Sequence, residues 1–261
     1  MNKPVALITG ATSGIGRAFA ERFAARGYDL ILTGRRRELI TSVAREIKKA
    51  SGVSVTVIIA ELTEEKGVQS VERVIEETEN LEVLVNNAGF GMDGQFIDLP
   101  VSGHLDMVTV HVAVPIRLMH AALPRMIENK KGTIINVASL GAFTPAPING
   151  IYGGTKSLLV VLSESLHLEL RRKGIRVQAL CPGFTRTDFH AKMGVQAKLD
   201  AGKLRFMTPD KVVDASLKAI RKGKVVCIPG FKNKFFYHLV RFSPRWAYYR
   251  VIELLYRKYL E

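Results

Sequence analysis

TGATSGIG, residues 9–16, follows an apolar segment at residues 5–9 and leads directly into an amphipathic segment at residues 14–25. Glycines let a backbone turn tightly and approach a bound group closely, and amide groups at a helix start attract the charge of a pyrophosphate. The spacing is GxxxGxG and not the GxGxxG of the general dinucleotide fingerprint. A glycine-rich turn alone is often only a turn. Its position between a strand and a helix predicts that this one binds a nucleotide.

The rest of the chain body repeats this alternation of an apolar strand with an amphipathic helix. Strands are predicted at residues 5–9, 30–33, 53–59, 83–86, 134–138, 177–181 and 225–228. Helices are predicted at residues 14–25, 38–50, 64–77, 106–128, 153–172 and 209–222. Strands that are apolar throughout, each followed by a helix, indicate a parallel sheet covered on both faces. The ligand crevice of such a sheet lies outside the carboxyl ends of its strands, so the residues after each strand are the candidates for chemistry.

The second predicted strand ends at Gly34 and continues into Arg35, Arg36 and Arg37. An NAD site places a carboxylate here for the ribose 2′-hydroxyl, whereas an NADP site places a cation for the 2′-phosphate. Asp29 lies at the opposite end of the strand, and a guanidinium pairs well with phosphate. The alternative is a solvated charge run at a helix start, although cations there oppose the helix dipole. The sequence therefore predicts NADP(H), with Arg35 as the phosphate ligand and Arg36 beside it.

The fifth predicted strand leads to Ser139, and Tyr152 and Lys156 follow in the segment YGGTK. Tyrosine and lysine at positions i and i+4 share one face of a helix. A phenol has a pKa near 10, and a nearby ammonium lowers that pKa towards neutrality by stabilising the phenolate. A serine hydroxyl beside them can hydrogen-bond a carbonyl oxygen as charge develops there. Each residue alone has an ordinary structural interpretation, but the three behind a cofactor turn predict a reaction centre.

Composition excludes several classes of protein. Hydrophobic residues make up 47% and charged residues 24%, which is typical of a globular domain and excludes wholesale disorder. Two cysteines, Cys181 and Cys227, exclude a disulfide framework and favour a reducing, cytoplasmic location. Cysteine and histidine do not cluster, so no metal site is predicted. The apolar runs are too short to predict a membrane-spanning helix, and the amino terminus reads as a strand and not as a signal peptide.

The formal net charge of +14 is concentrated at the carboxyl end. Residues 218–261 hold eleven Lys/Arg and two acids, and half of the twenty aromatic residues follow residue 230. Two short helices are predicted in residues 230–261, with Ser243 capping and Pro244 opening the second. Such helices suit peripheral contact with an anionic membrane; the alternatives are closure over a substrate pocket or a subunit contact. No base-stacking module is recognisable, so nucleic acid is not expected as a partner.

Five motifs together make the chain similar to a known family. They are TGATSGIG at 9–16, NNAG at 86–89, Ser139, YGGTK at 152–156 and PGFTRT at 182–187. In this order and at this spacing they resemble the short-chain dehydrogenase/reductase family, in its common branch of about 250 residues. The resemblance runs from residue 4 to about 228. It implies a Rossmann-type, doubly wound α/β fold with a seven-stranded parallel sheet and helices on both faces, forming one domain over residues 1–229. A lid at about 184–208 and a carboxyl-terminal helical extension at 230–261 complete the expected organisation.

The resemblance also implies an activity, which is NADP(H)-dependent interconversion of a ketone or aldehyde with an alcohol by hydride transfer. Tyr152 would be the general acid/base, Lys156 would hold the nicotinamide ribose and lower the Tyr152 pKa, and Ser139 would orient the substrate oxygen. The implied cofactor-binding residues, besides Tyr152 and Lys156, are Gly10, Thr12, Ser13, Gly14, Ile15, Gly16, Arg35, Arg36, Glu61, Leu62, Asn87, Ala88, Gly89, Pro182, Gly183, Thr185 and Thr187. Relatives are usually dimers or tetramers, so a homodimer or homotetramer is expected.

Two residues depart from the family pattern. His111 stands where the family usually has an asparagine that helps a bound water relay protons towards the lysine. An imidazole both donates and accepts hydrogen bonds, so it suits the same relay; alternatively, His111 is a packed helix residue. Glu61 stands where aspartate is usual, and its extra methylene would shift the contact with adenine. Alternatively, Glu61 is a surface residue.

The substrate is indicated only by apolar residues near the expected site, namely Phe90, Met92, Phe96, Phe143, Phe184, Phe189 and Met193. They favour an extended or apolar carbonyl compound, such as an acyl, steroid-like or lipid-like compound. Two other functions are weighed against a small-molecule reductase. A sugar-nucleotide epimerase or dehydratase is opposed by the GxxxGxG spacing. A non-catalytic, cofactor-binding sensor or membrane-docking protein is suggested only by His111 and the basic extension.

Overall fold

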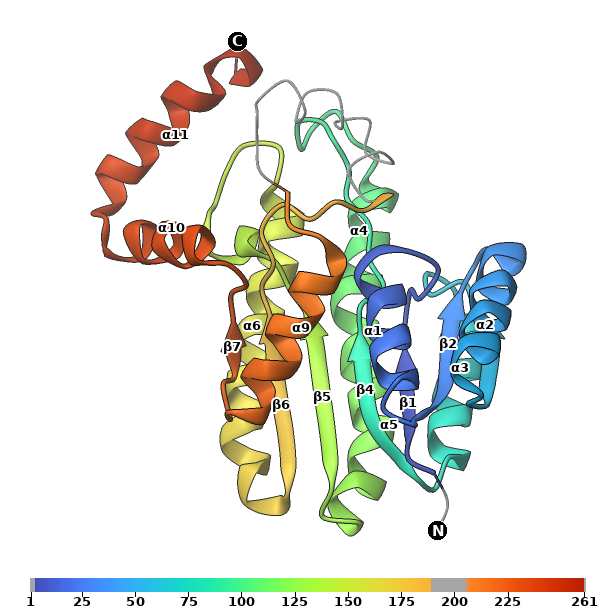
Figure 1. Cartoon of the computed structure of the whole chain (residues 1–261). Coiled ribbons are helices and arrows are strands. Elements are labelled where there is room, and N and C mark those ends of the chain that lie inside the picture. The colour runs from blue at the N-terminus through green and yellow to red at the C-terminus, as the bar shows by residue number, and fades with distance from the viewer. Residues whose placement is uncertain (1–2, 189–205, 261) are drawn as a thin grey trace.

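A computed structural model describes residues 3–188 and 206–260 (Figure 1). Its strands are β1 (Val5–Ile8), β2 (Asp29–Gly34), β3 (Val55–Ile59), β4 (Leu81–Asn86), β5 (Gly132–Val137), β6 (Ile175–Leu180) and β7 (Val226–Cys227). They form one sheet in the order β3-β2-β1-β4-β5-β6-β7, and every neighbouring pair is parallel. The predicted seven-stranded parallel sheet is confirmed. Most of the predicted lid at about 184–208 lies outside the described residues.

Helices cover both faces of the sheet (Figure 1). One face carries α1 (Gly14–Ala24), α2 (Arg37–Ser51) and α9 (Pro209–Arg221). The other carries α3 (Glu65–Glu77), α5 (Val114–Glu128) and α6 (Gly150–Leu170), and α4 (Val101–Val108) leads into α5. Successive strand residues point to opposite faces, so in β1 Ala6 and Ile8 pack into the first core while Val5 and Leu7 pack into the second. This double burial is why the strands are apolar throughout.

The longest helical segment differs from its prediction. The sequence predicts a helix over residues 106–128, but the helix begins at Val101 and contains a π-helical turn, η1 (Thr109–Ala113), between α4 and α5. Pro115 follows this turn, and a proline lacks the amide hydrogen that a regular α-helix needs. By length and composition alone Val101–Glu128 could cross a membrane. Its buried side chains, including Val110 and Leu118, instead pack against the sheet.

The strand order reverses between β1 and β4, where the crossovers diverge to opposite faces of the sheet. A ligand crevice opens at such a switch point. The turn after β1 is tight because α1 starts close to it: a Cβ on Gly16 would lie 2.4 Å from the Gly10 carbonyl oxygen. Gly10 itself has a φ of 67°, which favours glycine. The glycines thus position α1 directly over the crevice.

Two carboxyl-terminal helices, α10 (Phe231–Phe242) and α11 (Arg245–Leu260), match the pair predicted in residues 230–261. The predicted cap is wrong: Ser243 ends α10, where its hydroxyl donates to the Leu239 carbonyl oxygen, and Pro244 precedes α11. We call residues 231–260 the arm. Figure 1 shows α10 beside the carboxyl end of β7 and α11 projecting away from the sheet. The Tyr237 ring of α10 meets the Phe143 ring at 4.7 Å, and the buried Tyr248 of α11 donates a 2.7 Å hydrogen bond to the Pro145 carbonyl oxygen.

Candidate active site

The glycine turn after β1 and the NNAG segment after β4 are joined by hydrogen bonds. The Asn87 side-chain amide donates to the carbonyl oxygens of Thr9 (2.9 Å) and Gly10 (3.0 Å), and the Ala88 amide donates to the Thr9 hydroxyl (3.0 Å). A Cβ on Gly10 would approach the Ala88 Cα to 2.9 Å. The two segments therefore form one rigid edge of the crevice.

The start of α1 forms a second edge. Ser13 precedes the helix without a side-chain cap, and the first turn holds no acid, so its amide groups and dipole favour an anion. Gly14 has a φ of 58°, and a Cβ there would lie 2.8 Å from the Thr187 Cγ2. PGFTRT at 182–187 is thereby placed against the glycine turn. The cradle fits the pyrophosphate of a dinucleotide because the uncapped amide groups at the start of α1 attract an anion.

Arg35 and Arg36 follow β2 as predicted, and each has a partner. The Arg35 guanidinium lies 3.3 Å from the Glu61 carboxylate, and Arg36 donates a 3.2 Å hydrogen bond to the Thr12 hydroxyl. Burial opposes ionisation of Glu61, but hydrogen bonds from Thr63 and Arg35 outweigh it and lower the Glu61 pKa. Leu62 is buried in the core, so only its backbone can reach a ligand. Glu61 is thus a partner of the predicted phosphate ligand.

The three predicted catalytic residues converge at the carboxyl end of β5. Ser139 follows the strand, and its hydroxyl accepts a 3.0 Å hydrogen bond from the Gly141 amide. Tyr152 and Lys156 lie one turn apart near the start of α6, with the Lys156 Nζ 5.7 Å from the Tyr152 ring centroid. The Lys156 ammonium donates a 2.9 Å hydrogen bond to the Val137 carbonyl oxygen. The i, i+4 spacing and the strand end bring the three side chains together.

Burial is the largest influence on the pKa values of Tyr152 and Lys156. Burial lowers the pKa of Lys156 to about 8. It raises the pKa of Tyr152, against the smaller lowering effect of a hydrogen bond with Ser139. The sequence predicts a lowered Tyr152 pKa, and burial in the structure instead raises it. The expectation counted the charge of Lys156 but not the desolvation of the phenol, which is the larger effect here.

His111 lies in η1, buried against the site. Its Nε2 accepts a 3.1 Å hydrogen bond from the Phe90 amide, so Nδ1 carries the proton and faces the Thr155 hydroxyl at 3.1 Å. Thr155 in turn donates to the Tyr152 carbonyl oxygen at 2.8 Å. Burial and the Lys156 charge hold the His111 pKa well below its usual range. Both ring nitrogens have protein partners, which supports the packed-residue alternative over the relay.

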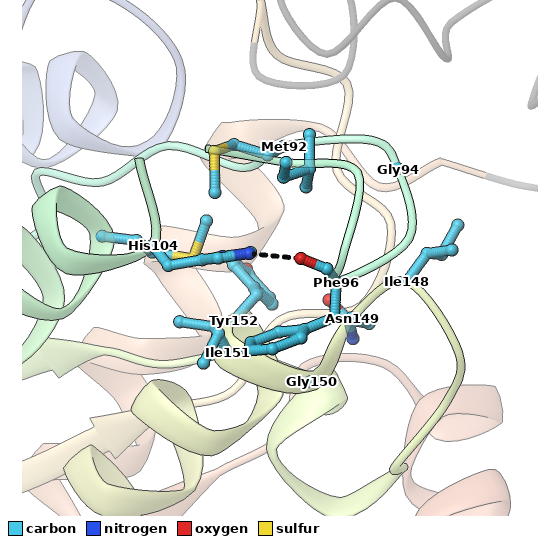
Figure 2. Close-up of a pocket in the computed structure, with 11 residues that line it drawn as sticks. Met92, Gly94, Phe96, His104, Ile148, Asn149, Gly150, Ile151 and Tyr152 are labelled. Carbon is cyan, nitrogen blue, oxygen red and sulfur yellow. Dashed lines mark hydrogen bonds between the residues drawn. The ribbon is translucent and has the colours of Figure 1, made fainter. Parts of the chain in front are cut away.

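An apolar pocket adjoins Tyr152 (Figure 2). Its lining residues are Met92, Gly94, Phe96, Leu99, His104, Met107, Ile148, Asn149, Gly150, Ile151 and Tyr152. Figure 2 shows the loop after β4, His104 of α4 and the start of α6 facing one another. Of the apolar residues expected near the site, Met92 and Phe96 line this pocket, whereas Phe189 and Met193 lie outside the described residues.

The sequence did not indicate His104. Its Nε2 donates a 3.1 Å hydrogen bond to the Phe96 carbonyl oxygen, and its ring stacks on the Phe96 ring at 4.8 Å, which shapes the pocket wall. A lone histidine on an apolar helix carries no signal of such a role. Across residues 3–188 and 206–260, no group of three or more His, Cys, Asp or Glu side chains is placed to hold a metal ion.

Comparisons with known proteins agree with this fold. The family model described as short chain dehydrogenase matches residues 4–198. Sulfoacetaldehyde reductase 2 of Chromohalobacter salexigens is 37% identical over 188 residues, covering 71% of this chain and 74% of that protein. A short-chain dehydrogenase from Sphingobium yanoikuyae in complex with NADPH is 37% identical with a TM-score of 0.82, covering 87% and 88% of the two chains. A 7β-hydroxysteroid dehydrogenase structure is 26% identical with a TM-score of 0.86, covering 95% and 96%.

Proposed function

The chain belongs to the short-chain dehydrogenase family, and from that membership we propose that it is an NADP(H)-dependent oxidoreductase interconverting a ketone or aldehyde with an alcohol. The observation that carries the proposal is the convergence of Ser139, Tyr152 and Lys156 beside the glycine cradle. A proton donor, an oxygen-orienting hydroxyl and a cation at one strand end suit carbonyl reduction.

The proposed mechanism assigns one task to each side chain. A nicotinamide cofactor, when bound, would supply the hydride. The Tyr152 phenol transfers its proton to the substrate oxygen, and the Ser139 hydroxyl donates a hydrogen bond to that oxygen as negative charge develops. The raised Tyr152 pKa keeps the phenol protonated at neutral pH, as a donor must be. Lys156, with a pKa of about 8, is mostly charged at neutral pH and stabilises the phenolate that remains.

We propose an extended or apolar carbonyl compound as substrate. The pocket beside Tyr152 is walled by Met92, Leu99, Met107 and Ile151, which favours burial of hydrocarbon next to the reacting oxygen. The similarity to a 7β-hydroxysteroid dehydrogenase, which extends over nearly the whole chain, is consistent with a bulky apolar substrate.

A panel of aldehydes and ketones, followed by NADPH absorbance, tests the proposed activity. We expect kcat/KM to rise along a series of ketones of increasing apolar length, because each buried methylene contributes about 0.8 kcal/mol, or roughly fourfold. A flat series would contradict an apolar pocket. The absence of carbonyl-dependent NADPH oxidation across the panel would contradict the proposed reaction itself.

NADP(H) preference is proposed from Arg35 and Arg36, which stand at the carboxyl end of β2. A bound 2′-phosphate would replace the Glu61 carboxylate as the partner of Arg35, because the phosphate carries more negative charge. We expect Arg35→Ala to raise the KM for NADPH about tenfold to a hundredfold and to leave the KM for NADH nearly unchanged.

Arg37→Ala is the matched control, since Arg37 is also exposed but stands two positions further along the chain, at the first residue of α2. Steady-state kinetics with both nicotinamides measure the effect. Equal changes with NADPH and NADH, or equal effects of the two variants, would contradict the role of Arg35.

A homodimer or homotetramer is proposed as well. Exposed apolar side chains gather on the neighbouring helices α4, α5 and α6, namely Val101, Leu105, Ile116, Leu158, Val161 and Leu168. Apolar surface of this kind is typical of subunit contacts. Members of the family are commonly oligomeric, which is in accord with this surface.

A further inference from the structure

The outer side of α10 carries an apolar stripe. Phe231, Phe235, Leu239 and Phe242 are 82%, 64%, 55% and 80% exposed. Their spacing of four, four and three residues places them along one face of the helix. Trp246, 72% exposed, continues the apolar surface at the start of α11. We call the four α10 residues the stripe.

The other side of α10 faces the domain. Tyr237 packs on Phe143, and Asn233 lies so close to Gly183 that a Cβ on that glycine would meet the Asn233 Oδ1 at 2.7 Å. Because Asn233 and Tyr237 occupy the face opposite the stripe, the stripe points away from the domain. The described part of the protein therefore leaves four large apolar side chains of one helix in water. Exposed patches of this kind are interaction sites.

Cations flank the stripe. Lys232 lies on one side of it and Lys234 on the other, as helical spacing requires. Arg241 lies nearer the opposite face, where it donates a hydrogen bond to the Tyr237 hydroxyl. On α11, side chains are described as far as residue 257, and they add Arg245, Arg250 and Arg257 against one acid, Glu253. An apolar face bordered by cations is the pattern of helices that lie in a membrane interface, where Lys and Arg meet anionic headgroups.

We propose that the stripe and its flanking cations bind the surface of an anionic lipid bilayer. A second copy of the chain is the less favourable occupant, because two such faces would bring like charges together. An anionic membrane complements both the charge and the apolar side chains. The arm contacts Phe143 and Pro145, so α10 would hold the pocket end of the domain near the bilayer. A pocket held near the bilayer would suit an apolar substrate. Only this consequence rests on the proposed function.

Vesicle sedimentation of the full chain tests the proposal without measuring activity. The two vesicle types are phosphatidylcholine alone and phosphatidylcholine mixed with phosphatidylserine. We expect binding to the mixed vesicles that weakens with salt, and little binding to phosphatidylcholine alone. The double variant Lys232→Glu/Lys234→Glu should lower the partition coefficient at least about tenfold, since each cation near an anionic surface contributes roughly a factor of five.

Lys48→Glu/Lys49→Glu is the charge control, because it makes the same change at exposed lysines near the end of α2. For the stripe, Phe242→Ser should weaken binding about tenfold, and Ile97→Ser, at an equally exposed residue of the loop before α4, should not.

Equal effects of the two charge variants, or no binding of the unmodified chain to the mixed vesicles, would overturn the proposal. So would a fall in oligomer mass caused by Phe242→Ser, measured by light scattering, with vesicle binding unchanged. That result would assign the stripe to a second copy of the chain. Carbonyl reduction without vesicle binding would refute this inference alone, and vesicle binding without reduction would refute only the proposed function.

Discussion

Tyr152→Phe should lower kcat for carbonyl reduction by about a hundredfold to ten-thousandfold, because it removes the proton that the substrate oxygen must receive. The substitution deletes one oxygen atom and keeps the ring, which packs edge-on against His111 at 5.6 Å. Binding of NADPH should be nearly unchanged, since the glycine cradle and Lys156 remain. Steady-state assays, with NADPH binding measured separately by fluorescence, separate the two effects.

Tyr28→Phe is the matched control, since this tyrosine precedes β2 at the opposite end of the sheet from the site. It should leave kcat unchanged. Full activity of Tyr152→Phe would remove the catalytic assignment, and equal losses in both variants would point to a general effect on the fold.

Lys156→Met should abolish most activity and yet make the protein more stable at neutral pH. The fold lowers the Lys156 pKa from 10.5 to about 8, so charging this buried group at neutral pH costs about 3 kcal/mol of folding free energy. Methionine avoids that cost but leaves the Val137 carbonyl oxygen without its partner, which costs about 1–2 kcal/mol. A net gain of about 1–2 kcal/mol should remain, while kcat falls about a hundredfold or more.

The sign of the pH dependence follows from proton binding. Between pH 8 and 10.5 the unfolded chain binds a proton at Lys156 that the folded chain has lost, so the wild type gains stability as pH rises through this window. Below pH 8 the penalty is fully present. The stability advantage of Lys156→Met should therefore be largest below pH 8 and disappear towards pH 10.5.

Urea unfolding at several pH values measures this difference. Lys48→Met, at an exposed lysine of α2, is the control and should shift the unfolding midpoint little at any pH. A Lys156→Met variant that is less stable than the wild type at neutral pH would contradict the expected burial penalty.

Local patterns were sufficient to predict the sheet and the convergence of Ser139, Tyr152 and Lys156. Each strand is an apolar run with a helix after it, and the i, i+4 spacing of Tyr152 and Lys156 places them on one face of α6. Strand ends gather at one edge in a parallel sheet, so Ser139 could be placed beside them from the sequence alone. The start of α4 was missed because Pro100 precedes it without a side-chain cap and Gly103 lies in its first turn.

Contacts between distant segments could not be predicted. The pairing of Arg35 with Glu61 joins the ends of β2 and β3, and the bonds of His111 join the loop after β4 to α6. The raised Tyr152 pKa depends on how completely several segments cover the phenol, and a sequence pattern does not encode burial. For the same reason, the contact of His104 with Phe96 appears only once the loop before α4 is placed.

The reversal of strand order at β1 has a consequence for how the chain is made. β2 and β3 follow β1 directly, but the strand on its other side, β4, pairs with it across a separation of 76 to 77 residues, as Val5 with Leu81 and Ile8 with Val85 show. During synthesis the first three strands are complete before β4 exists. Until then, the edge of β1 that will pair with β4 has no partner strand. Pairings this distant form slowly and expose backbone groups to other chains. The topology that creates the binding crevice thus also leaves an edge of β1 open to aggregation in the nascent chain.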